Sequence, residues 1–232
     1  MRCPIRLVVA VWLGSTALGV LGCSGHPFRA DAWSWNKKPA PVIPGLKTAD
    51  ERIQELRELA QRAPKMGDLE REQTANGLSK EIQSENDLLV RIEMLKCLAV
   101  MPCPMSAAVL RAGLDDKEAD VRVVCCQAWG KIGGDEAVAE LTRVLNSDTD
   151  VDVRLAAASA LGVTRVPSAT KPLGEALADP NPAMQARAMA GLKQVSGKDF
   201  GNNVQAWKQF AAGQPADYQP PTVADRLKRL WK

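Results

Sequence analysis

A segment of about 31 residues recurs four times along this chain of 232 residues. The copies align on Arg91, Arg122, Arg154 and Gln185, and an apolar residue precedes each of these positions. Further apolar residues stand at +7 and +19, and an acidic residue stands at −6 in every copy. A fixed period of this size is typical of proteins built from stacked repeats. We therefore expect a row of similar units, each in contact mainly with its neighbours.

Each copy predicts a helix, a tight turn and a second helix. Apolar residues at −1, +3, +6 and +7 follow the helical period, and small residues such as Ala157 let neighbouring helices approach closely. The pair Gly133-Gly134, or a proline at Pro104 or Pro167, breaks the chain near +11 to +13. The pattern therefore predicts an all-α fold, an α/α superhelix. Residues suited to cap the first helix stand at −4 in three copies: Asp87, Asp150 and Asn181.

The predicted solenoid has about five helix pairs. Residues 48–84 carry two helical patterns, 49–63 and 69–82, which we interpret as a degenerate pair that caps the N-terminal end. The repeats themselves occupy residues 85–212. Six apolar residues of the middle copies are predicted to lie in the core: Val121, Trp129, Leu141, Val153, Leu161 and Leu173.

The helix–turn–helix unit with a period near 31 and the pattern V-R-x-x-A-x-x-A-L resemble HEAT repeats, in the short bacterial form called PBS-lyase-like HEAT. The resemblance covers roughly residues 85–212. In that family a turn Asp and a helix Arg form a ladder that ties the repeats together. Where Gln185 replaces the Arg, the contact with Asp179 is expected to be weakened or water-mediated. The resemblance assigns the ladder to Asp116 with Arg122, Asp148 with Arg154 and, as a conservative variant, Glu85 with Arg91.

The N-terminus predicts export. Arg2 and Arg6 precede a run of 15 uncharged, mostly apolar residues, which suits a signal peptide and is short for a membrane span. The run ends in V-L-G-C at Cys23, which resembles the lipobox of bacterial lipoproteins. That resemblance implies a signal peptide over residues 1–22, a lipid on Cys23, and anchorage to the cell envelope. By resemblance to the enterobacterial lipoprotein sorting rule, Ser24 after the cysteine implies the outer membrane, facing the periplasm. An ordinary secretory signal and an uncleaved anchor remain alternatives.

Two further segments flank the repeats. Residues 23–47 hold four prolines and no helical period, so we expect a flexible tether in which Trp33 and Trp35 dock on the folded part, lie in the lipid interface or have no specific role. Residues 213–232 predict a linker and a short amphipathic helix. That helix is expected to cap the last repeat, to act as a detachable recognition element, or to stay disordered.

Composition excludes several kinds of site. The chain has 1 His, His26, within the expected tether, so a multi-histidine metal centre cannot form and we expect no metal and no cofactor. Charge is nearly balanced, with 30 basic and 27 acidic residues, and only 4% of residues are aromatic, which argues against nucleic-acid binding. Cys97, Cys125 and Cys126 occupy helical core columns, whereas Cys103 stands on a loop and is the cysteine most disposed to react. Whether any of them form a disulfide is left open.

We therefore predict a non-enzymatic scaffold for unknown protein partners, with no small-molecule substrate. Two enzymes with HEAT-like repeats fit poorly. Deoxyhypusine hydroxylase needs His and Glu iron ligands, which this sequence does not supply. Bilin lyases act in the cytosol, whereas the N-terminus of this chain predicts export. The alternatives are a structural envelope component without a specific partner and a lyase-related HEAT enzyme. The expected binding surface lies on the second helices and on the C-terminal tail: Arg111, Glu140, Arg143, Lys171, Glu175, Leu227 and Trp231.

Overall fold

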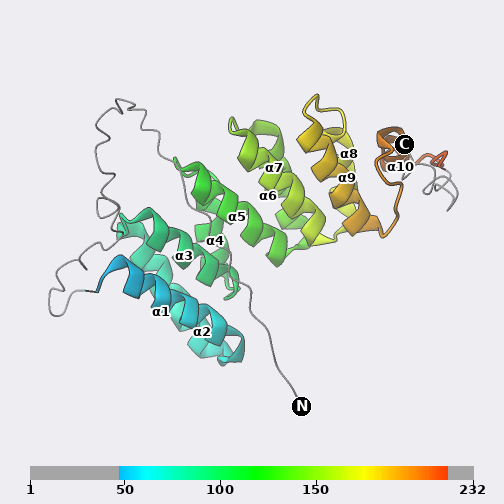
Figure 1. The fold of residues 1–232 in the computed structure, drawn as a ribbon. Coiled ribbons are helices and arrows are strands. Elements are labelled where there is room, and N and C mark those ends of the chain that lie inside the picture. The colour runs from blue at the N-terminus through cyan, green and yellow to red at the C-terminus, as the bar shows by residue number, and fades with distance from the viewer. Residues whose placement is uncertain (1–46, 219–232) are drawn as a thin grey trace, which may run out of the picture. The chain divides into compact units, whose positions relative to one another are not determined.

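The computed structural model describes residues 47–218. The expected signal peptide, Cys23, the tether and the C-terminal helix with Leu227 and Trp231 lie outside the described residues. Within the described range the regular structure is entirely helical (Figure 1). The α-helices are α1 Ala49–Arg62, α2 Asp68–Glu81, α3 Leu88–Ala99, α4 Pro104–Gly113, α5 Ala119–Ile132, α6 Gly134–Ser147, α7 Val151–Thr164, α8 Thr170–Ala176, α9 Pro182–Ser196 and α10 Val204–Ala211.

These ten helices form five consecutive pairs, as the repeat pattern predicts. The odd-numbered helices pack against one another as one layer, in the order α1, α3, α5, α7 and α9. The even-numbered helices form the second layer, and each packs against the odd-numbered helices beside it. The all-α fold and the HEAT-like arrangement of about five helix pairs are therefore confirmed. Short 3₁₀ turns follow or precede three helices: Ala63–Lys65, Ile82–Ser84 and Pro167–Ala169.

Side-chain caps fix where the first helix of most repeats begins. The carboxylate of Asp87 accepts hydrogen bonds from the backbone N–H groups of two residues in the first turn of α3, and Asp150 does the same for α7. Asn181 caps α9, and Pro182 follows at the first helical position, where its missing N–H costs no hydrogen bond. These three caps are confirmed. Ahead of the repeats, Thr48 and Glu51 form a reciprocal capping box on α1.

The core lies between the two helix layers. The apolar residues at each +7 position are fully or almost fully buried, and so are the leucines of the second helices that face them. This burial follows from the helical period, because one stripe of each helix must leave water together. The six predicted core residues are each at most 1% exposed: Val121, Trp129, Leu141, Val153, Leu161 and Leu173.

Glycines let the odd-numbered helices of the C-terminal half lie very close together. A Cβ at Gly162 in α7 would lie 2.6 Å from the Cα of Gly191 in α9. A Cβ at Gly130 in α5 would lie 2.9 Å from the carbonyl oxygen of Ala160 in α7. Such distances are too short for real side chains, so these helices can pack at this spacing only without a Cβ at these positions.

An aromatic cluster closes the C-terminal end of the row. Trp207 is fully buried, and its indole N–H donates to the carbonyl oxygen of Gly201 at 2.9 Å. The ring of Phe200 packs edge-on against Trp207 and against Tyr218, with centroids 4.8 and 5.5 Å apart. The described part of the expected linker, residues 213–218, thus returns to the last repeat. The edge-on contact of the partly buried Tyr218 ring with Phe200 is the physical reason.

Candidate functional site

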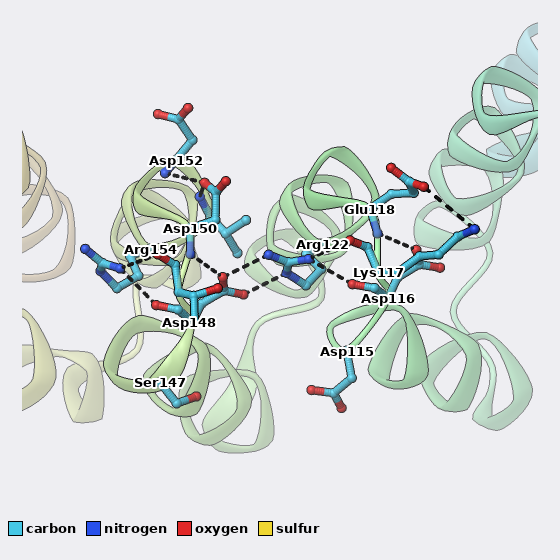
Figure 2. A network of polar contacts seen from close by, with 12 residues as sticks. Asp115, Asp116, Lys117, Glu118, Arg122, Ser147, Asp148, Asp150, Asp152 and Arg154 are labelled. Carbon is cyan, nitrogen blue, oxygen red and sulfur yellow. Dashed lines mark hydrogen bonds and ion pairs between the residues drawn. The ribbon is translucent and has the colours of Figure 1, made fainter.

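Charged side chains link the turns of neighbouring repeats (Figure 2). The carboxylate of Asp148 accepts from Arg122 at both oxygens, from Nε at 2.8 Å and from Nη2 at 3.0 Å. It also accepts from the backbone N–H of Asp150 at 2.9 Å. Arg122 Nη1 donates in turn to the backbone carbonyl oxygen of Asp116 at 2.9 Å. Arg122 therefore joins its own turn to the turn of the next repeat.

The rungs of this ladder run between repeats rather than within them. Besides Arg122 with Asp148, Arg52 pairs with Glu85 at 2.5 Å, and Arg91 pairs with Asp116 at 3.5 Å. The carboxylate partners therefore differ from the within-repeat pairs assigned by resemblance. The reason is position, because each arginine lies in the first turn of an odd-numbered helix, and the next repeat's acidic residue lies in the turn just before the neighbouring odd-numbered helix. Within its own repeat Arg122 binds the backbone carbonyl oxygen of Asp116 rather than its carboxylate.

The last two repeats keep the contact within the turn, whereas no ion pair joins Arg154 to Asp179 within residues 47–218. Arg154 Nη1 donates to the carbonyl oxygen of Asp148 at 2.9 Å. Gln185 Nε2 makes the equivalent bond to the carbonyl oxygen of Asp179 at 2.9 Å, so the amide replaces the guanidinium directly and needs no bridging water. The Asp179 carboxylate accepts from the backbone N–H of Asn181 at 2.7 Å. Gln185 thus keeps the turn contact of the arginine without its charge.

The Arg122–Asp148 pair is the most enclosed of these rungs. Its side chains are 14% and 8% exposed. Hydrogen bonding to Asp148 raises the pKa of Arg122, although burial opposes the charge. Burial alone would raise the pKa of Asp148, but the hydrogen bonds from Arg122 and from the Asp150 N–H lower it below its ordinary value. Both groups are therefore charged at neutral pH, and the pair acts as a structural link.

The even-numbered layer holds the described part of the predicted binding surface, and its charges largely pair with one another. Arg111 Nε lies 2.9 Å from Glu140 Oε1, and Arg111 also pairs with Glu136. Arg143 Nη1 lies 2.8 Å from Asp115 Oδ1, and Arg143 pairs with Glu140 as well. These contacts bridge α6 to α4 and to the turn after α4, across the gap between repeats. Lys171 and Glu175 in α8 are exposed and make no ion pair within residues 47–218.

The odd-numbered layer carries a groove along the exposed face of α7. Its volume is about 450 Å³. The hollow exists because α7 presents short side chains such as Ala156 and Ser159, whereas α5 and α9 present longer ones on either side. Two cations lie at its rim, Lys131 from α5 and Arg187 from α9, and neither makes an ion pair with a described residue. The remaining lining residues are Gln127, Asp152, Leu155, Ala160 and Val163.

A second hollow of about 470 Å³ opens beside α4. Arg91 and Asp116, the members of the longest ladder rung, form part of its wall. The buried Nε of Arg91 has no hydrogen-bond partner among the described atoms. The rest of the lining is mainly apolar and includes Leu95, Met105 and Val109.

The four described cysteines are free thiols with structural surroundings. Cys103 is the N-cap of α4, where its Sγ accepts from the backbone N–H of Ser106 at 3.4 Å. Burial raises the pKa of Cys97 to about 11, and the Cys97 thiol donates to the carbonyl oxygen of Leu56 at 2.9 Å. Burial also raises the pKa of Cys125, and that of Cys126 to about 12. Protonated thiols are poor nucleophiles, so the buried cysteines serve packing.

Two kinds of feature are absent from residues 47–218. In that range no three His, Cys, Asp or Glu side chains gather closely enough to hold a metal ion. No helix of the described part combines the length and apolar character that a membrane crossing requires.

Comparison with known proteins identifies the repeat. The fold is a two-layered row of helix pairs tied together at their turns, and the family model for HEAT repeats matches residues 75–162. Residues 75–162 of the chain are therefore HEAT repeats. The crystal structure of an engineered protein aligns with a TM-score of 0.43 and 19% identity, over 73% of this chain and 82% of that one, a likeness too weak to argue from. No curated protein matches the chain.

HEAT repeats typically mediate protein–protein interactions, which directs attention to the exposed layers. Sequence reasoning placed the binding surface on the second helices and missed the groove on α7. The available signal was the combination of short residues at +2 and +5 in α7 with long residues on its neighbours. The sequence assigns no role to Ala156 and Ser159, because helical periodicity does not show which small side chains face solvent.

Proposed function

We propose that this protein is a non-enzymatic, protein-binding HEAT-repeat scaffold that is lipid-anchored at Cys23 in the bacterial cell envelope. The observation that carries the binding part is the groove on α7, flanked by Lys131 and Arg187. It offers an accessible apolar floor, and on the same face two cations that no described residue pairs with. These are two features that a protein partner can use.

The contrast between the two layers favours the odd-numbered face as the binding surface. On the even-numbered layer Arg111 and Arg143 already pair with acidic residues of the same molecule. A partner that used those side chains would have to break existing ion pairs. On the α7 face a partner meets Lys131 and Arg187 without such competition from the described residues. This difference supports binding at α5, α7 and α9.

The non-enzymatic and envelope parts of the proposal rest on the sequence. The chain's single histidine, His26, precedes the repeats, so a histidine-dependent relay would have to recruit it from outside them. The V-L-G-C segment at Cys23 follows a run of 15 uncharged residues, which suits lipoprotein export.

Site-specific photocrosslinking tests the binding face. A photoreactive amino acid replaces Ser159 on α7 in the full chain, and a matched variant carries it at Lys171 on α8. We expect a discrete heteromeric adduct from Ser159 in intact cells and little from Lys171. Adducts from Lys171 alone, or none from either, would contradict the proposed face. Adducts of the chain with itself would instead favour a self-assembling structural component.

Replacement of Cys23 tests the anchor separately. In Cys23→Ala, labelling with a radioactive fatty acid should disappear, and the protein should leave the membrane fraction after washing with salt and carbonate. A matched Ser24→Ala variant should keep both properties. Retention of Cys23→Ala on washed membranes would overturn the lipid anchor and leave the crosslinking result unaffected.

A further inference from the structure

The groove along α7 has a defined length and direction. It runs from Asp152 in the first turn of α7 to Val163 in the last, a span of eleven residues or about 16 Å along the helix. Leu155 and Ala156 lie between these ends on the floor. Three turns of a second helix have the same length. The floor is therefore matched to a short helix lying along α7.

Short side chains make the floor suitable for a helix. At Ala156 and Ser159 the side chains of α7 reach little beyond the backbone, so another helix can approach closely. The contact of α7 with α9 inside the layer shows such a close approach, through Gly162 and Gly191. Helix-in-groove binding places an apolar stripe of the partner into such a channel. Leu155 and Val163, which is 47% exposed, provide apolar contacts for that stripe.

The charges at the rim indicate the partner's charge and direction. Lys131 lies in the last turn of α5, and Arg187 faces the groove from α9. Asp152, the one acidic lining residue, stands at the opposite end from Val163. The N-terminal turn of a helix favours carboxylates, since the helix dipole is positive there. A helix that lies antiparallel to α7 brings such a turn to the Val163 end, away from Asp152.

We propose that the α7 groove binds an acidic amphipathic helix of about three turns from a partner protein, antiparallel to α7. Its apolar stripe covers Leu155, Ala156 and Val163, and its carboxylates pair with Lys131 and Arg187. This inference rests on the proposed protein-binding function and specifies the chemistry of the partner at the same face.

Synthetic helical peptides test this chemistry on the full chain. One peptide carries an apolar stripe flanked by glutamates, and a second carries the same stripe flanked by lysines. Fluorescence anisotropy should show that the acidic peptide binds about tenfold more tightly, because each of two rim ion pairs contributes severalfold. The difference should shrink as salt is added, since exposed charges are screened.

Charge reversal provides the decisive variant. Lys131→Glu combined with Arg187→Glu should invert the preference, so that the basic peptide becomes the tighter ligand. Lys171→Glu, on the other layer, is the matched control and should leave the preference unchanged. Ser159→Trp should weaken both peptides by filling the groove. Circular dichroism and thermal melting verify that each variant is folded.

Three results would overturn the inference. They are equal affinities of the two peptides for the wild-type chain, no binding of either peptide at millimolar concentration, and an unchanged preference in the double reversal. Each is distinguishable from failure of the proposed function. If the Ser159 crosslink to a partner persists in the double reversal, the face still binds protein and only the acidic-helix assignment falls.

Discussion

The junction between α5 and α7 and the junction between α3 and α5 both carry an Arg–Asp rung but differ in how extensively their helices contact each other. At α5–α7, Gly130 lies against Ala160, and Arg122 holds both oxygens of Asp148. At α3–α5, the residue of α3 that corresponds to Gly130 is Ala99. Arg91 reaches only one oxygen of Asp116, at 3.5 Å. The second junction also borders the 470 Å³ hollow.

The two rungs therefore differ in geometry although the same charged residue types form them. Arg and Asp are present at both junctions. At the α5–α7 junction, where Gly130 lies between the helices, the guanidinium of Arg122 reaches the next turn with two parallel bonds, which is its strongest geometry. At the junction without this glycine, the Nε of Arg91 is left buried without a partner among the described atoms. We infer that the α3–α5 junction is the weaker of the two.

Removing the arginine from each rung should produce the largest contrast. Arg122→Met leaves Asp148, whose side chain is 8% exposed, without its main partner, so we expect a loss of about 3 kcal/mol in the free energy of unfolding. Arg91→Met removes a single long contact together with an unsatisfied N–H, and should cost about 1 kcal/mol or less. Urea denaturation of the two variants measures the difference.

Equal losses in the two variants would contradict the comparison. They would mean that the Arg91 rung is as strong as the Arg122 rung despite its length. Arg122→Lys gives an intermediate test, because lysine keeps the charge but cannot form two parallel bonds. It should recover only part of the lost stability.

Adding one methyl group at the close junction should have the next largest effect. In Gly130→Ala the new Cβ would lie 3.0 Å from both the Cα and the Cβ of Ala160, so α5 and α7 must separate, at a cost of about 1–3 kcal/mol. Gly77→Ala is the matched control, because a methyl group on Gly77, inside α2, would have no atom within 4 Å beyond its own stretch of helix. That change should stabilise by about 0.5–1 kcal/mol. A gain in both variants would show that the junction tolerates separation.

The sequence predicted the repeat frame better than the contacts between repeats. Column agreement identified the helices, the caps at Asp87 and Asp150, and core residues such as Leu161, because burial on one helix face leaves a period in the sequence. It did not show that Arg122 pairs with the carboxylate of Asp148 rather than with that of Asp116. That choice depends on the distance between neighbouring helices, and periodicity within one repeat carries no information about it.

The candidate site was harder to predict for a related reason. Charged residues of the second helices resemble a binding surface when they are taken one at a time. The structure brings Arg111 beside Glu140, and Arg143 beside Asp115, from different repeats. These partners stand 29 and 28 residues apart in the chain, and such pairings cannot be derived from charge alone. The groove on α7 depends similarly on which side chains of three helices are long and which are short.

Acid should weaken the close junction through Asp148. Its pKa is lowered in the folded protein, so the stability it contributes is complete above its unfolded value, about 3.9, and is lost as the pH falls through the folded value. Asp148→Asn should therefore lose stability at neutral pH but decline less steeply below about pH 4. When Arg122→Met is present in both proteins, the free energies of unfolding of the form with Asp148 and of the form with Asp148→Asn should fall in parallel as the pH is lowered. Identical profiles of wild type and Asp148→Asn would contradict this role.

The smallest effect compares two adjacent cysteines that report on the two junctions. Cys125 Sγ packs against Gly113 and faces the α3–α5 side, whereas Cys126 lies close enough to Asp148 and Arg122 to feel their charges. Both are fully buried with raised pKa values, so a thiol reagent reaches them only when the structure opens locally. In a Cys103→Ala background, one variant keeps Cys125 without Cys126 and the other keeps Cys126 without Cys125. Mass spectrometry over time should show that the thiol reagent modifies Cys125 severalfold faster than Cys126. Equal rates would mean that both junctions open together as one cooperative unit, because a reagent admitted at one junction would then reach both thiols in the same event.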